Sequence, residues 1–527
     1  MFQKTVEIWN LHFLEKCRSL KQFKEIHAHL LKSHLTENPL SISPLLSFAA
    51  VSGDIALFGH ACSIFRSLCY RSTFMYNTVI RGHVQTHSPA SAILCYLQML
   101  NYGLASNNYT FPPLIKACTL LNCPPSKLVG RLVHGHAVKF GFSDDPFILS
   151  SLIEFYSSVL DTEAARRLFD GSPNRDVVLW TAMVDAYGKT GDVKNARALF
   201  DEMPVRNAIS WSAMMAGYSR VSDFKEVLRL FGQMQDLGTK PNESVLVSVL
   251  TACAHLGALT QGMWVHSYVR RNNLESNPIL ATAVVDMYSK CGCIGSALSV
   301  FEGILNKDVR SWNAIISGVA MNGDAKKSLE LFDKMILHGT QPTEVTFVAI
   351  LTACTHAGLV DKGIELFEQM GTVYRVEPQF EHYACIVDLL ARAGMLMDAE
   401  KFIEERMGGY EGGDANVWGA LLSACRVYGN VEIGNRVRKK LANLRVSDCG
   451  SYVLLYNIYR EAGWEMEAKR VRSSITEEGL KKKPGCSLIE VDGIVDEFLV
   501  GDLSHPQAKE ISEILDSLFK VVSLEQL

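Results

Sequence analysis

Seven glycines recur through the second half of the sequence at an almost constant interval. They are Gly257, Gly292, Gly323, Gly358, Gly394, Gly429 and Gly463, separated by 35, 31, 35, 36, 35 and 34 residues. Each lies between two amphipathic stretches, where a residue able to adopt the left-handed backbone conformation would end one helix before the next begins. A hairpin of 31 to 36 residues buries its apolar face only against its neighbours. The sequence therefore predicts an all-α fold, an α-solenoid of helix-turn-helix repeats.

Composition limits the partners of such an array. Apolar residues make up 48% of the chain, and the longest apolar runs are far too short to span a bilayer, so we expect a soluble protein without a membrane partner. The net charge of −4 does not favour nucleic-acid binding, for which a basic domain is usual. Acids can, however, lie on the convex helices while basic and polar groups line the groove.

The cysteines follow the repeat. Cys118, Cys253, Cys354 and Cys425 each follow an alanine at one register of the unit, and so we interpret them as small buried apolar residues. The sequence contains no Cys-x-x-Cys pair, which makes a structural zinc site improbable. Thiols scattered in this way indicate a reducing compartment.

The residues that open each unit argue against tetratricopeptide repeats, which have a similar length. That repeat opens with Trp-x-x-Leu-Gly-x-x-Tyr. These units open with an aromatic residue and then a small polar one, as in Tyr76-Asn77, Trp180-Thr181, Trp211-Ser212 and Trp312-Asn313. Longer units close near a proline, as at Pro241 and Pro342.

With these motifs the chain resembles the plant pentatricopeptide repeat family, in particular its PLS branch, whose units alternate in length. Units that start four residues before the small polar residue are 73–107, 108–145, 146–176, 177–207, 208–242, 243–277, 278–308, 309–343, 344–379 and 380–414. The expected organisation is degenerate repeats over 1–72, the repeat array over 73–414, an E-type helical extension over 415–490 and an E+-type tail over 491–527. The tail resembles that of the branch at Val500 to Pro506.

The resemblance implies that each unit reads one base of single-stranded RNA through its fifth and last residues. An unpaired base exposes an edge whose donors and acceptors two polar side chains can match. The implied pairs are Asn77/Asn107 for cytosine, Ser150/Asp176 for guanine, Thr181/Asn207 and Ser212/Asn242 for adenine, Thr282/Asp308 for guanine and Asn313/Thr343 for a pyrimidine. Three units, Pro112/Asp145, Val247/Asn277 and Val348/Gln379, lack a polar fifth residue, and the pair Ala384/Asp414 of the last unit is also weak. The expected tract is therefore C-x-G-A-A-x-G-Y-x-x.

The second position of the unit has two interpretations. In the family this residue sandwiches successive bases, and here it is Phe74, Phe147, Val178, Ile209 or Ile279. Ordinary packing between helices would explain each of these side chains equally well. For the fifth residues, the alternative is a helix cap or a solvated turn.

Catalysis by this chain is not expected. Some members of the branch end in a zinc cytidine deaminase, which needs His-x-Glu and Pro-Cys-x-x-Cys, and the sequence contains neither. His134 with His136, or His382 with Cys385, could be considered as metal ligands, but their place within repeat helices favours a structural role. We predict no cofactor and no metal.

The resemblance implies a site-recognition factor for C-to-U editing of organellar RNA. Its partners would be single-stranded RNA, a deaminase-bearing editing protein supplied in trans and other editing factors. Residues from about 415 onward, with their basic clusters, are the expected docking surface, although a plain capping role for terminal repeats is almost as well supported. A splicing or stability factor and a protein-binding scaffold remain alternatives. The expected compartment is the mitochondrion, with the chloroplast as the alternative.

Overall fold

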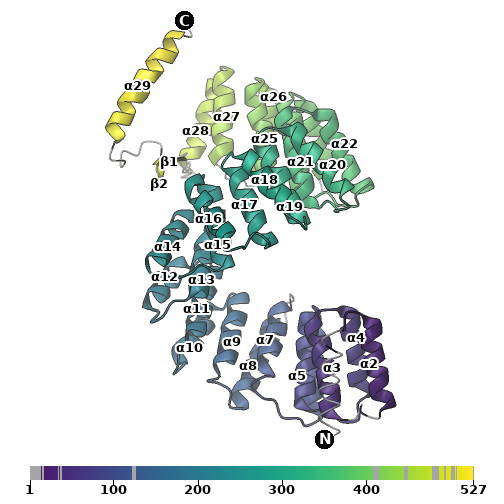
Figure 1. Cartoon of the computed structure of the whole chain (residues 1–527). Coiled ribbons are helices and arrows are strands. Elements are labelled where there is room, and N and C mark those ends of the chain that lie inside the picture. Colours follow the sequence, from purple (N-terminus) through teal and green to yellow (C-terminus); the bar gives the residue numbers. More distant parts are fainter. Residues whose placement is uncertain are drawn as a thin grey trace. The chain divides into compact units, whose positions relative to one another are not determined.

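The computed structural model describes residues 14, 17–33, 35, 38–121, 126–407, 415–443, 449–477, 486–491, 494–499, 505 and 507–525. Within these residues the chain is almost entirely helical. Its contacts divide it into an N-terminal module, Met1–Glu226 with Gly232–Val245, and a C-terminal module, Val227–Phe231 with Leu246–Leu527. In each module, helical hairpins follow one another in sequence order (Figure 1). The predicted α-solenoid is confirmed.

The helices fall into two sets. After α2 (Leu20–Lys32), the first helices of the hairpins are α3 (Pro39–Ser52), α5 (Thr73–Gln85), α7 (Phe111–Leu120), α9 (Pro146–Ser158), α11 (Val177–Lys189), α13 (Ala208–Arg220), α15 (Glu243–Leu256), α17 (Pro278–Lys290), α19 (Val309–Met321), α21 (Glu344–Ala357), α23 (Phe380–Arg392), α25 (Ala415–Val427) and α27 (Cys449–Glu461). The second helices are α4 (Ile55–Ser67), α6 (Pro89–Asn101), α8 (Ser126–Lys139), α10 (Thr162–Gly171), α12 (Val193–Glu202), α14 (Phe224–Asp236), α16 (Leu259–Arg271), α18 (Ile294–Gly303), α20 (Ala325–Leu337), α22 (Val360–Thr372), α24 (Leu396–Met407), α26 (Val431–Asn443) and α28 (Glu465–Glu477).

First helices of successive hairpins pack against one another, and each also packs against its own second helix. Helix α11, for example, contacts α9, α12 and α13, and helix α19 contacts α17, α20 and α21. Within each module the first helices therefore form one layer, which the second helices cover on one side.

Nine of the ten predicted units begin at the first residue of a helix. The exception is the unit predicted to start at 108, whose helix α7 begins three residues later at Phe111. Pro112 and Pro113 follow directly. A proline is tolerated in the first turn of a helix, where its missing N–H has no intrahelical partner, but it breaks a helix further along.

The recurring glycines have the backbone that their spacing predicts. All seven have φ between 66° and 86°. Gly358, for instance, ends helix α21 in the left-handed conformation, and its N–H donates to the carbonyl of Thr355 at 3.3 Å. A side chain with a Cβ would be strained at this point of the turn.

The end of the chain departs from an all-helical architecture. Strands β1 (Cys486–Val491) and β2 (Ile494–Leu499) pair in antiparallel register, with Cys486 opposite Leu499 and Val491 opposite Ile494. Helix α29 (Ala508–Glu525) follows. The hairpin spans the boundary predicted between the E-type extension and the tail.

None of the helices described is long and apolar enough to cross a membrane.

Candidate nucleic-acid interface

The last residue of most coded units caps the first helix of the next unit. Asp176 Oδ1 accepts the N–H of Leu179 at 2.8 Å, and Asp308 Oδ1 accepts that of Ser311 at 2.9 Å. Asn207 Oδ1 accepts the N–H groups of Ile209 and Ser210, both at 3.0 Å. Capping uses one side-chain oxygen. The second polar atom of each side chain takes no part in these capping bonds.

A cation fixes this cap in the short units. Arg175, directly before Asp176, donates from Nε to the carbonyl of Phe169 at 3.0 Å and from Nη2 to that of Asp170 at 2.9 Å. Its guanidinium lies 4.9 Å from the centre of the Phe169 ring, and that ring meets Trp180 edge to face at 4.9 Å. Arg206 on Phe200 and Lys307 on Phe301 repeat this arrangement.

The fifth residue lies one turn into the first helix, so none of these residues is the cap that the alternative interpretation required. In two units it contacts the last residue of the same unit directly. Asn77 Nδ2 donates to Asn107 Oδ1 at 2.9 Å, and Asn313 Nδ2 donates to Thr343 Oγ1 at 3.2 Å. In these two units the fifth and last residues, 30 positions apart in sequence, therefore meet.

In three units the hydroxyl group of the fifth residue donates a hydrogen bond to a backbone carbonyl of its own helix. Thr181 and Thr282 donate to the carbonyls of Val177 and Pro278, both at 2.7 Å. Ser150 donates to the carbonyl of Phe147 at 3.1 Å. In this state the hydroxyl offers only lone pairs to a ligand.

Ser212 differs from the other fifth residues. It is only 8% exposed, and its Oγ donates to Ser244 Oγ at 2.7 Å. The neighbouring helix, whose second residue is Ser244, covers it. Asn242, the last residue of the same unit, directly precedes helix α15, and its Oδ1 accepts the N–H of Val245 at 2.9 Å.

The residues at the second position are all exposed. Their exposed fractions are 57% for Phe74, 72% for Phe147, 56% for Val178, 62% for Ile209 and 59% for Ile279. Ordinary packing between helices would bury them, so that interpretation does not hold. These side chains are accessible to a ligand.

Several of the predicted residues line one groove of the N-terminal module. The groove has a volume of about 560 Å³ and is lined by residues that include Ser150, Thr181, Asn207 and Ser212, with Val178 and Ile209 between them. These side chains come from the first helices α9, α11 and α13 and their caps. The structure thus brings residues of three successive units to one surface.

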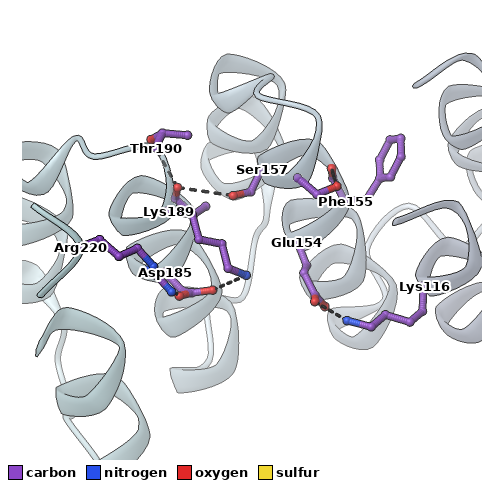
Figure 2. A network of polar contacts seen from close by, with 10 residues as sticks. Lys116, Glu154, Phe155, Ser157, Asp185, Lys189, Thr190 and Arg220 are labelled. Carbon is purple, nitrogen blue, oxygen red and sulfur yellow. Dashed lines mark hydrogen bonds and ion pairs between the residues drawn. The ribbon is translucent and has the colours of Figure 1, made fainter. Parts of the chain in front are cut away.

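Charged residues that the sequence analysis did not select, among them Glu154, Asp185, Lys189 and Arg220, also line this groove. Figure 2 shows Lys116 reaching Glu154, and Lys189 and Arg220 both beside Asp185. Lys189 Nζ lies 2.7 Å from Asp185 Oδ2, and Arg220 Nη1 lies 3.7 Å from Oδ1. Asp185 and Lys189 lie four and eight residues after Thr181, which places all three on one helix face.

This charge pattern recurs in the C-terminal module. Asp286 and Lys290, at 2.9 Å, follow Thr282 by the same two intervals, and Asp388 and Arg392, also at 2.9 Å, follow Ala384. The signal was present in the sequence as an acid and a base at fixed distances from the fifth residue.

The candidate metal ligands have structural partners. His134 Nδ1 lies 2.8 Å from the hydroxyl of Tyr156, and His136 Nδ1 lies 3.1 Å from that of Tyr96. His382 is buried and bonded to the backbone of Gln379 and Glu344. Across the described residues, no three His, Cys, Asp or Glu side chains come together as a metal site would require.

The four repeated cysteines are buried, as their register predicts. Each is at most 1% exposed. Burial raises the pKa of Cys118 and Cys253 to about 12, and that of Cys354 and Cys425 to about 11.

The predicted docking surface is only partly basic. Arg436 holds Glu400 through Nε at 2.8 Å and Nη2 at 2.6 Å, and Lys440 lies 2.9 Å from Glu404, so these cations join helices α24 and α26. Helix α29 exposes Ile514, Leu515 and Leu518. Of the motif Val500 to Pro506, only His505 is described, and Lys481 to Lys483 lie outside the described residues.

Comparison with known families gives four matches. The PPR repeat matches residues 74–104, 178–207, 209–239, 280–309 and 345–372, and the PPR repeat family matches 307–356. The E motif matches residues 428–490, and the E+ motif matches 495–520.

Relatives of similar length exist in Arabidopsis thaliana. One pentatricopeptide repeat-containing protein is 46% identical, over 95% of this chain and 80% of its own length. A second relative, named as mitochondrial, is 35% identical over 96% of this chain and 89% of its own length. A third, named as chloroplastic, is 33% identical over 97% of this chain and 82% of its own length. The crystal structure of the pentatricopeptide repeat protein PPR10 from maize matches 90% of this chain and 80% of its own with a TM-score of 0.54 at 15% identity, a likeness of fold.

Proposed function

Because the chain belongs to the pentatricopeptide repeat family and carries E and E+ motifs, we propose that it binds single-stranded RNA in a sequence-specific manner. The observation that carries the proposal is the groove in which Ser150, Thr181 and Asn207 stand at successive units, beside the exposed Val178 and Ile209. Polar groups at unit spacing fit base edges, and exposed apolar side chains fit base faces.

The hydrogen bonds of the fifth and last residues support the two guanine positions. Ser150 and Thr282 have donated their hydroxyl protons to the backbone, and their partners Asp176 and Asp308 are acceptors. Guanine presents N–H donors on its Watson-Crick edge, which such acceptor pairs match. At Thr181/Asn207, the amide group of Asn207 adds a donor, as adenine requires.

Ser212 contributes less than its partner under this proposal. Because its hydroxyl is covered and bonded to Ser244, Asn242 carries most of the readout of the second adenine. The pairs Asn77/Asn107 and Asn313/Thr343 are already in contact, and Asn313 Oδ1 also accepts the hydroxyl of Thr346 at 2.6 Å. To read a pyrimidine, the Asn77 and Asn313 amides exchange these internal bonds for bonds to the base.

We further propose that the RNA is an organellar transcript and that the bound site is edited from C to U by a deaminase in trans. The E and E+ motifs and the exposed apolar residues of α29 support a docked editing partner. The mitochondrion is the proposed compartment, with the chloroplast as the alternative, since relatives carry both names. The chain itself acts by binding and not by catalysis.

Binding to short RNAs tests the proposal. One RNA carries C-x-G-A-A-x-G-Y, and a second has both adenines changed to cytosine. We expect tighter binding of the first, by about tenfold or more, because each good two-point match discriminates by about 1–3 kcal/mol. Asn207→Asp with Asn242→Asp should move the preference toward guanine at these two positions. Equal affinity for the two RNAs would refute the assignment.

Salt dependence separates RNA binding from the scaffold alternative. Phosphate contacts make affinity fall with salt, and a protein interface depends on salt far less. Plants that lack the protein separate editing from a splicing or stability role. If the protein acts in editing, the bound site is no longer edited in these plants, while splicing and transcript level stay normal.

A further inference from the structure

Cations in the groove of the N-terminal module, and at equivalent positions of the C-terminal module, are already paired with acids. Asp185 is shared by Lys189 on its own helix, at 2.7 Å, and by Arg220 on the neighbouring helix, at 3.7 Å. Lys116 on α7 pairs with Glu154 on α9 (Figure 2). Lys290 pairs with Asp286 and Arg392 with Asp388 at equivalent positions. A strand lying against the fifth residues would bring its phosphates near these cations.

Stability does not explain this arrangement. The Asp185 and Lys189 side chains are 30% and 38% exposed, and exposed pairs of this kind contribute little to folding. Their effect on a ligand is larger. A carboxylate beside the cation cancels the charge that would attract a phosphate, and it repels the phosphate itself.

We propose that Asp185, together with Asp286, limits the sequence-independent part of RNA affinity. The inference rests on the proposed RNA binding and adds a role for residues that contact no base. A paired cation releases fewer counterions on binding than a free one, so phosphates contribute less at these units and the base contacts weigh more in whether RNA stays bound. RNA without the target sequence is therefore bound weakly, although Lys189 and Arg220 line the groove.

The sign of the effect distinguishes this role from a positioning role. If Asp185 only aimed Lys189 at a phosphate, Asp185→Asn would weaken binding. Under the proposal it strengthens binding of both test RNAs, by about fivefold at 0.1 M salt or below, because a repulsive charge is removed and two cations are freed. The slope of log affinity against log salt should steepen by about 0.7 for each phosphate newly contacted.

The two aspartates provide an internal comparison. Asp185→Asn frees Lys189 and Arg220, whereas Asp286→Asn frees Lys290, so the first variant should have the steeper slope. Asp185→Asn combined with Lys189→Gln should return affinity and slope toward those of the unchanged protein. Circular dichroism and thermal unfolding confirm that each variant is folded.

Asp201→Asn is the matched control. Asp201 pairs with Arg197 at 2.8 Å with the same spacing of four residues, but on the second helix α12 and away from the residues that line the groove. Its RNA affinity and salt slope should not change. Weaker binding or an unchanged slope for Asp185→Asn overturns the inference. If the unchanged protein does not distinguish the two RNAs, the proposed function fails instead.

Discussion

Glu490 of strand β1 caps helix α16 from 230 residues away. Both of its carboxylate oxygens accept the N–H of Thr260 at 3.2 Å. Helix α16 begins after Ala258, which has no side chain able to cap it. Several other second helices are capped locally by aspartate, as α12 is by Asp192. Strand β1 therefore completes a helix of the repeat array within the C-terminal module.

Replacing Glu490 should loosen this helix terminus. Glu490→Ala removes a cap and a charge that favours the positive end of the helix, at a cost of about 1 kcal/mol. Hydrogen exchange at the Thr260 amide, followed by mass spectrometry or NMR, should become about fivefold faster for that loss. Glu490→Gln keeps an acceptor and should show an intermediate rate. Unchanged exchange at Thr260 would show that the contact does not hold in solution.

Arg175 should stabilise the boundary between two short units. Arg175→Ala loses two bonds to carbonyls and the stacking on Phe169, so we expect a loss of about 1–3 kcal/mol in the free energy of unfolding. Urea denaturation measures it. Arg175→Lys should lose less, because Lys307 fulfils the same role elsewhere. Arg167→Ala on the neighbouring helix α10 is the control and should change stability by less than about 0.5 kcal/mol.

The two units that we propose to read adenine pack through a close contact between glycines. A Cβ added at Gly217 would lie 3.2 Å from the Cα of Gly188, and one at Gly188 would lie 3.0 Å from the Cα of Gly217. Gly217→Ala should therefore separate α11 from α13 and destabilise by about 1–3 kcal/mol. Affinity for the C-x-G-A-A RNA should fall with it. At Gly135 in α8 an added Cβ meets nothing within 4 Å, and Gly135→Ala should stabilise by about 0.5–1 kcal/mol.

Acid should destabilise the N-terminal module through His134. Burial lowers the pKa of this histidine below its usual 6.5, so the unfolded chain binds the proton more readily than the folded one. Stability is full above about pH 6.5 and falls as the pH drops toward the lowered folded pKa. His134→Gln should reduce the difference between urea midpoints at pH 7.5 and 5.5. A pH dependence identical to that of the unchanged protein would contradict this role.

Local sequence was sufficient for much of the fold. The start of helix α11 at Val177 and the left-handed turn at Gly358 follow from apolar periodicity and turn chemistry within one unit. The burial of Cys253 follows from its register in that unit. The β-hairpin was missed, although Asp492-Gly493, a strong signal for a two-residue connection, stands between its strands in the sequence.

For the candidate site, the sequence determined which residues recur at the fifth, second and last positions, because those positions repeat with the unit. Only the tertiary structure decided which of them a ligand can reach. Ser150 and Ser212 occupy the same register of the unit. Ser212 is nevertheless covered, because Ser244 of helix α15, the first helix of the next unit, contacts it. The contact of Asp185 with Arg220 joins helices α11 and α13, and the cap from Glu490 to Thr260 joins strand β1 to helix α16. Such contacts depend on how units stack, which no single unit encodes.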